Sequence, residues 1–491
     1  MALLKAIISF ITVLIFNLSL MPGIQLPSAD LPETRSADPE VVGSLNLLAA
    51  PAANAVSQVS LSSFGGSRLD RVTGSDAKNG ICTVCGVSES RDGDFAAAGA
   101  TRPFGFIRRY DSNGSLTASA YVTASGLSVN LSDVCTLRNG GAVVCGYTYS
   151  SGDSNVKTTS FISEYSPSLE LLWTETLEGS NNITAQSVST SLDGFVLGGQ
   201  TASVDGEFEG CDFFGAPCAF LARYKIIQDP DTGERSPSRV WLKTISGEAT
   251  SEITDVEVDS SNNIFVCVST LAVGGNYASF DGLLKNSLDC VVLRYNAVGS
   301  LQWYYTLASE GRDYFNCVVP DNSGGCLAAG TSVKTGAGIS TPLGGTFSGV
   351  NYVSGTDGYA VKLTPAGALS WCKPVAGNGE DYITSAVKLG SGYVVGGYST
   401  SYTREFSVNN GGYDGFADFI TSSGAKTEML NLGGTGNDRV VSLSEASGNL
   451  VISGISVSQD LFFEGMNTYA YVDDYSFISN DISDCFIAVY S

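Results

Sequence analysis

The side chains that could carry chemistry in this sequence are mainly carboxylates, tyrosines and cysteines, because the chain contains no histidine. Nucleophilic Ser-His-Asp and Cys-His arrangements and histidine-ligated metal sites are therefore excluded. A pair of Asp or Glu residues could still hydrolyse a glycosidic bond, so a carbohydrate-active enzyme that uses loop carboxylates is an alternative function. However, Asp289, Asp357, Asp414 and Asp484 recur at equivalent positions beside turns. This recurrence indicates turn capping, because a catalytic acid is needed only once, and we expect no enzyme activity.

Acidic loops could also hold calcium, which prefers carboxylate and carbonyl oxygens. The candidate ligands lie in three short loops and are Asp92, Asp94, Asp205, Glu207, Asp229 and Asp231. None of the loops matches the spacing of an EF-hand, so the pattern favours solvated turns and no cofactor, with calcium as the alternative.

The twelve cysteines allow two interpretations. In an exported chain they would form disulfides. The candidate pairs are Cys211 with Cys218, Cys135 with Cys145, Cys317 with Cys326, and Cys267 with Cys290. Buried free thiols are the alternative, because several of these cysteines lie where a strand requires a small residue.

Composition narrows the choice of fold and partner. The chain has 26 Lys and Arg against 49 Asp and Glu, a formal net charge of −23, and such a surface repels nucleic acids. Hydrophobic residues make up 43% and charged residues 15%, which is sufficient for a large core. The 57 glycines indicate short strands separated by tight turns.

An internal repeat of roughly 60 residues positions these side chains. A short apolar strand that ends in small residues occurs seven times, at 82–86, 142–146, 195–199, 264–268, 326–330, 393–397 and 450–454. A further strand follows each copy, and Trp173, Trp241, Trp303 and Trp371 share one position in a fourth strand. We expect these tryptophans to fill the core where blades diverge, with stacking on a ligand as the alternative. Four antiparallel strands per repeat predict an all-β, seven-bladed β-propeller.

The two ends of the repeat region complement each other. The last repeat stops after its third strand at Tyr490, whereas residues 56–64 form a spare strand before the first repeat. We predict that this N-terminal strand pairs with the last one and closes the ring, because an open ring would leave a sheet edge exposed.

The pattern resembles the SBBP-type repeats of bacterial secreted and surface proteins. The resemblance is carried by the segments 90–95, 203–208 and 414–416, which follow an Asp-Gly-x-Phe or Asp-Gly-Phe pattern. It covers residues 56–491 and implies a seven-bladed propeller that acts as a non-catalytic interaction module.

The N-terminus resembles an export signal. Lys5 precedes an apolar run, so residues 1–29 are predicted to be a signal peptide, with an uncleaved signal anchor as the alternative, and residues 30–55 a flexible linker. We expect a secreted or surface-tethered monomer that binds a protein or glycan through its blade loops, chiefly 269–288 and 332–356. A structural spacer in a surface layer is a further alternative.

Overall fold

The computed structural model describes residues 56–150, 157–283, 287–309, 311–334, 353, 355–466 and 483–491. Val56–Ser491 forms one compact unit. The predicted signal segment and linker lie outside the described residues. Within those ranges, no helix is long and apolar enough to cross a membrane.

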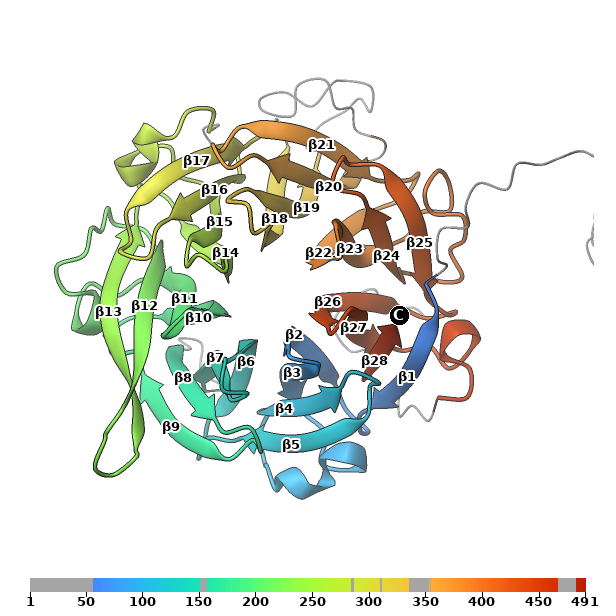
Figure 1. Ribbon diagram of the computed structural model, residues 1–491, viewed down its shortest axis with the longest axis horizontal. Helices are drawn as coiled ribbons and strands as arrows, with labels where there is room; N and C mark the ends of the chain where they lie inside the picture. The colour runs from blue at the N-terminus through green and yellow to red at the C-terminus, as the bar shows by residue number, and fades with distance from the viewer. Residues whose placement is uncertain are drawn as a thin grey trace, which may run out of the picture. The chain divides into compact units, whose positions relative to one another are not determined.

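Seven four-stranded antiparallel sheets are arranged as blades around one axis (Figure 1). The inner strands are β2 (Asp70–Lys78), β6 (Ser128–Thr136), β10 (Ile183–Thr190), β14 (Ser251–Val258), β18 (Arg312–Pro320), β22 (Asp381–Leu389) and β26 (Asp438–Ala446). The second strands are β3 (Ile81–Ser88), β7 (Ala142–Tyr149), β11 (Gly194–Thr201), β15 (Ile264–Thr270), β19 (Cys326–Val333), β23 (Gly392–Ser399) and β27 (Asn449–Ser456).

The outer half of each blade consists of two further strands. The third strands are β4 (Phe104–Asp111), β8 (Thr159–Tyr165), β12 (Cys218–Gln228), β16 (Asp289–Tyr295), β20 (Thr356–Leu363), β24 (Asp414–Ile420) and β28 (Asp484–Tyr490). The outer strands are β5 (Leu116–Val122), β9 (Leu171–Thr176), β13 (Arg235–Ile245), β17 (Leu301–Leu307), β21 (Leu369–Val375), β25 (Lys426–Leu432) and β1 (Gln58–Phe64). We number the blades 1 to 7 by their inner strands, from β2 to β26.

The chain closes its own ring, as the sequence predicts. Strand β1 pairs antiparallel with β28, with Leu61 opposite Ala488 and Phe64 opposite Cys485. Beyond the strands, Ser57 and Ser491 exchange two backbone hydrogen bonds of 3.1 and 2.9 Å. In Figure 1 the blue β1 lies beside the red β28. Blade 7 therefore contains both ends of the repeat region, and β28 has no free edge.

Small residues in the second strands let neighbouring blades approach closely. A Cβ atom on Gly198 would lie 2.5 Å from Ile253 of blade 4, and one on Gly396 would lie 2.9 Å from Val440 of blade 7. Cys145, at the equivalent position of blade 2, is fully buried. Close packing between blades explains why this position carries Gly, Cys, Ala or Ser in all seven blades.

The four tryptophans lie on outer strands, where they are half-buried against the core. Three of them reach the next blade through the indole N–H. Trp241 donates to the Ala297 carbonyl at 3.2 Å, Trp303 to Pro365 at 3.1 Å, and Trp371 to Ser422 at 3.0 Å. The fourth, Trp173, donates to the buried carboxylate of Glu164 at 2.6 Å. Aromatic area thus joins blades at their wide ends.

Candidate functional site: the channel and the loop face

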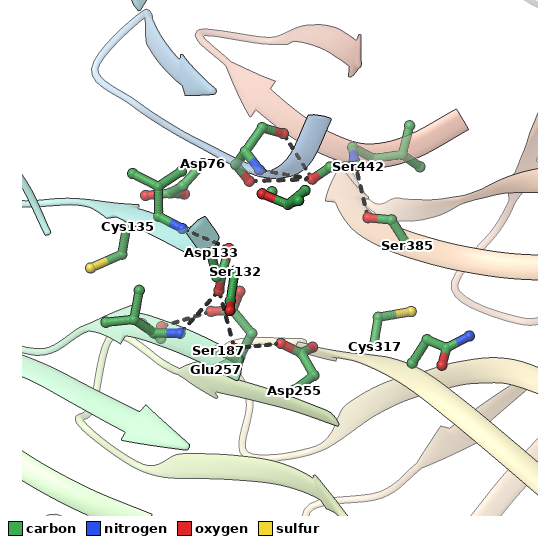
Figure 2. A pocket seen from close by; sticks show the side chains of 18 of the residues that line it. Asp76, Ser132, Asp133, Cys135, Ser187, Asp255, Glu257, Cys317, Ser385 and Ser442 are labelled. Atoms are coloured by element: carbon green, nitrogen blue, oxygen red, sulfur yellow. Dashed lines mark hydrogen bonds between the residues drawn. The ribbon is translucent and has the colours of Figure 1, made fainter. Parts of the chain in front are cut away.

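The inner strands surround a central channel that contains a cavity of about 330 Å³ (Figure 2). Each inner strand has a β-bulge at its fourth or fifth residue. A bulge turns the following side chain toward the channel. These post-bulge residues are Gly74, Asp133, Ser187, Asp255, Cys317, Ser385 and Ser442.

Five of the seven post-bulge side chains accept a hydrogen bond from the backbone N–H of the next inner strand. The pairs are Ser442 with Ser75 (3.1 Å), Asp133 with Val188 (3.0 Å), Ser187 with Val256 (3.1 Å), Asp255 with Val318 (2.7 Å) and Ser385 with Leu443 (3.0 Å). The channel wall is therefore a seam that joins one blade to the next. It satisfies backbone groups that the bulges remove from sheet pairing.

Two carboxylates in this seam share one serine. Ser187 Oγ lies 3.2 Å from Asp133 Oδ2 and 3.1 Å from Asp255 Oδ1. A hydroxyl has one hydrogen, so it can donate to only one of them at a time. Burial raises the pKa of Asp133 to about 7, and the nearby charge of Asp255 adds to this rise. Burial also raises the pKa of Asp255 and of Glu257, which accepts from Ser189 at 2.9 Å.

A second set of buried carboxylates begins three of the inner strands. Asp70, Asp381 and Asp438 each accept one backbone N–H and two serine hydroxyls. The donors to Asp438 are Gly434 N–H at 2.7 Å, Ser456 at 2.5 Å and Ser458 at 2.8 Å. Burial raises the pKa of all three carboxyls to about 6. The Gly/Asp turns thus hold the first strand to the second in blades 1, 6 and 7.

The calcium candidates do not converge in the structure. Among the described residues, no group of three Asp, Glu or Cys side chains could hold a metal ion. Asp92 accepts from Ser67 N–H at 2.7 Å, and Asp205 accepts from Ser180 N–H at 2.8 Å. These bonds lower the pKa of both exposed carboxyls.

Three of the other four loop candidates also use their carboxylates locally. Asp94 pairs with Arg108 at 3.4 Å, and Glu207 pairs with Arg239. Asp229 caps a turn by accepting from Asp231 N–H at 2.8 Å. Five of the six candidate carboxylates are therefore engaged by neighbouring groups, and Asp231 takes part through its backbone N–H.

The structure contains none of the candidate disulfides, and all twelve cysteines are free thiols. The strand registers do not place the predicted partners opposite each other. Cys135 faces Val143 and Cys145 faces Asp133, while Cys317 faces Ala329 and Cys326 faces Pro320. Cys290 faces Ser269 and not Cys267. Cys211 and Cys218 are free as well.

The two long loops that were predicted to bind a partner are described by the structure to different extents. Most of 332–356 lies outside the described residues. Loop 269–288 contains the short 3-10 helix η3 (Gly275–Ser279), in which Tyr277 is fully buried and donates to the Ile245 carbonyl at 3.2 Å. Phe280 packs on Tyr304 with ring centroids 4.8 Å apart. Part of this loop is therefore core.

The sequence interpretation missed a group of tyrosines on the loop face, the face formed by the inter-blade turns and the loops between second and third strands. Tyr382 and Tyr398 are cross-strand partners in blade 6 and stack with centroids 4.9 Å apart. Tyr413 lies edge-on to Tyr398 at 5.2 Å. Arg439 of blade 7 lies over the Tyr398 ring at 4.7 Å, and Tyr413 donates to Glu380 at 2.8 Å. We call these five residues the tyrosine cluster.

Comparisons with known proteins concern the architecture. No family model and no curated protein matches the sequence, so the likeness to SBBP-type repeats remains a resemblance. Among solved structures, the chain is similar to the WD40 β-propeller domain of Doa1 (TM-score 0.44, 11% identity, covering 89% of this chain and 96% of that chain). It is also similar to Chaetomium thermophilum Sqt1 bound to the N-terminus of ribosomal protein L10 (0.42, 11%, 81% and 98%). A third similar structure is the phage phi92 endosialidase (0.41, 9%, 88% and 68%). Likenesses at this level do not extend to function.

Proposed function

We propose that this chain is a non-catalytic propeller, exported or tethered at a cell surface, that binds a protein or glycan through its loop face. One observation carries the proposal: the channel carboxylates accept backbone hydrogen bonds from neighbouring blades, whereas the loop face carries half-exposed aromatic and charged side chains. The N-terminal apolar run supports export, and the resemblance to SBBP-type repeats supports an interaction module.

The proposal is tested by offering the full chain a panel of purified surface polysaccharides and surface proteins. Binding and chemical turnover are measured side by side. We expect saturable binding with no release of reducing ends or cleaved product. A partner that is bound and then degraded would contradict the non-catalytic function.

A specific observation favours one alternative, a carbohydrate-active enzyme. Asp133 combines a pKa near 7 with a position on the wall of the cavity, and strongly shifted carboxyls in cavities are catalytic candidates. If glycan hydrolysis occurred and disappeared in Asp133→Asn, this alternative would replace the binding function. If Asp133→Asn changed only stability, the carboxyl would be structural.

A further inference from the structure

We propose that the tyrosine cluster is a binding site for a neutral saccharide. This inference rests on the proposed function and specifies the ligand class and the place on the loop face. The cluster joins two blades, since Glu380 and the three tyrosines belong to blade 6 and its connecting loops, whereas Arg439 is the second residue of β26.

The exposure of these rings distinguishes them from the other aromatic side chains that seal the loop face. Phe95, Phe208 and Phe463 are 0 to 1% exposed and fill gaps under their loops. In contrast, Tyr382 and Tyr398 are half-buried, as is Tyr413. Packing alone would be served better by buried phenylalanine. A tyrosine at a surface presents an apolar ring and a polar hydroxyl together, which suits binding.

The polar groups of the tyrosine cluster are held in place, and two of them have no hydrogen-bond partner among the described residues. The Arg439 guanidinium lies over the rings of Tyr398 and Tyr413, at 4.7 and 5.5 Å. Among the described residues it makes no ion pair or hydrogen bond, although the chain has nearly twice as many acidic as basic residues. The Tyr398 hydroxyl likewise has no hydrogen-bond partner in the described part of the chain. These donors are available to a ligand without breaking an existing bond.

Glu380 supplies the complementary acceptor. One of its oxygens, Oε2, accepts from Tyr413 at 2.8 Å and from Tyr382 at 3.3 Å. The two tyrosines thus hold an exposed carboxylate beside the stacked rings. Aromatic surface with a few convergent donors and acceptors matches the two sides of a sugar ring: its C–H groups pack on aromatic faces, and its hydroxyls both donate and accept.

Charge selects among saccharides. Glu380 and Arg439 balance each other within the cluster, whereas the whole chain carries a net charge of −23. That field disfavours polyanionic glycans on approach. A neutral saccharide is therefore the ligand that the cluster fits best.

The test is binding of the full chain to immobilised neutral oligosaccharides, namely glucans, mannans, galactans and N-acetylglucosamine oligomers, with polyuronates and sialylated glycans as the acidic arm. For a neutral saccharide that binds, we expect Tyr398→Ala and Arg439→Ala each to weaken affinity by at least about tenfold. Tyr398→Ala removes a free hydroxyl and the ring that lies between Tyr382 and Arg439, and Arg439→Ala removes a free donor. Tyr398→Phe keeps the ring and loses only the free hydroxyl, so it should weaken affinity by a smaller factor, about threefold.

Blade 2 and blade 1 offer matched controls. Tyr147 follows a glycine in β7 as Tyr398 does in β23, and Arg71 follows the aspartate of β2 as Arg439 does in β26. Tyr147→Ala and Arg71→Ala should leave saccharide affinity unchanged. Thermal unfolding of every variant separates loss of binding from loss of fold.

Several results would overturn the inference. They are no binding of any neutral saccharide, preference for the acidic arm, or affinity that is unchanged in both folded alanine variants. A protein partner that binds the loop face while no saccharide does would refute the inference and leave the proposed function intact. If neither a protein nor a saccharide bound, both would fail.

Discussion

The start of the inner strands and the middle of the same strands both bury carboxylates, but their hydrogen-bond donors come from different parts of the chain. Asp70, Asp381 and Asp438 take theirs from residues 4, 18 and 20 positions away, in all three cases. Asp133 and Asp255 accept from Val188 and Val318, which lie 55 and 63 positions away. The first set holds a turn to its blade, and the second holds one blade to the next.

The two regions therefore depend differently on ring closure. A local motif can form in any blade that folds. Each bond of the channel seam requires two neighbouring blades to be in place, so the complete seam forms only when all seven blades have assembled into the ring. A buried aspartate therefore stabilises a single blade in the first region and the contact between two blades in the second.

Deletion of residues 56–64 should have the largest effect. It removes the outer strand of blade 7 and leaves β28 with an exposed edge, which promotes aggregation. We expect loss of soluble, cooperatively folding protein, measured by size-exclusion chromatography and circular dichroism. Deletion of 1–55 is the control and should leave the fold intact. A soluble, unchanged protein after loss of 56–64 would refute closure by β1.

Stability should fall as pH rises from about 4.5 to 7.5. Burial raises the folded-state pKa of Asp438 to about 6 and of Asp133 to about 7, above the ordinary value of 3.8. The folded state therefore binds these protons more tightly than the unfolded state, and the stabilisation is lost as they leave. One shift of about two pKa units corresponds to roughly 3 kcal/mol at most.

Urea unfolding at several pH values measures this fall and assigns it to the two regions. Asp438→Asn should flatten the profile between about pH 4 and 6, and Asp133→Asn between about pH 4 and 7, so only Asp133→Asn should remove the slope between pH 6 and 7. A free energy of unfolding that increased with pH across this window would show that the carboxyls are not buried as described.

Alanine substitutions at neutral pH should lower the free energy of unfolding by different amounts in the two regions. Asp438→Ala leaves three buried donors without an acceptor and should cost about 3 kcal/mol. Asp133→Ala should cost about 1 to 2 kcal/mol, because water in the channel can replace the lost acceptor. The urea midpoints give both values. Equal losses at the two sites would remove the distinction between local motif and seam.

Calcium and chelator should have the smallest effect. Asp92 and Asp205 are committed to backbone N–H groups, so we expect the Tm to change by less than about 1 °C when calcium is added or EDTA removes it. The Tm of Asp92→Asn, a variant that weakens the loop without involving a metal, gives the size of a purely structural effect for comparison. A rise of several degrees with calcium would reveal a site that these loops form only with the ion.

Much of the fold was predictable from the sequence because it depends on patterns of residues that are close together in the chain. The small-residue strands, the glycine and aspartate turns and the unpaired end strand lie within single repeats, and together they predict seven blades and their closure. The resemblance of loop sequences such as 90–95 also reflects local structure, since Phe95 seals its own blade.

The channel and the tyrosine cluster were decided only by the tertiary structure. A bulge in β6 shifts the register by one residue and turns Asp133 toward Ser187 of another blade. The turn between β6 and β7 places Cys135 opposite Val143 and not opposite Cys145. Likewise, Arg439 meets Tyr398 only because blade 7 packs against blade 6. Periodicity within a repeat determines what each blade is, whereas contacts between blades depend on register and packing, which no local pattern encodes.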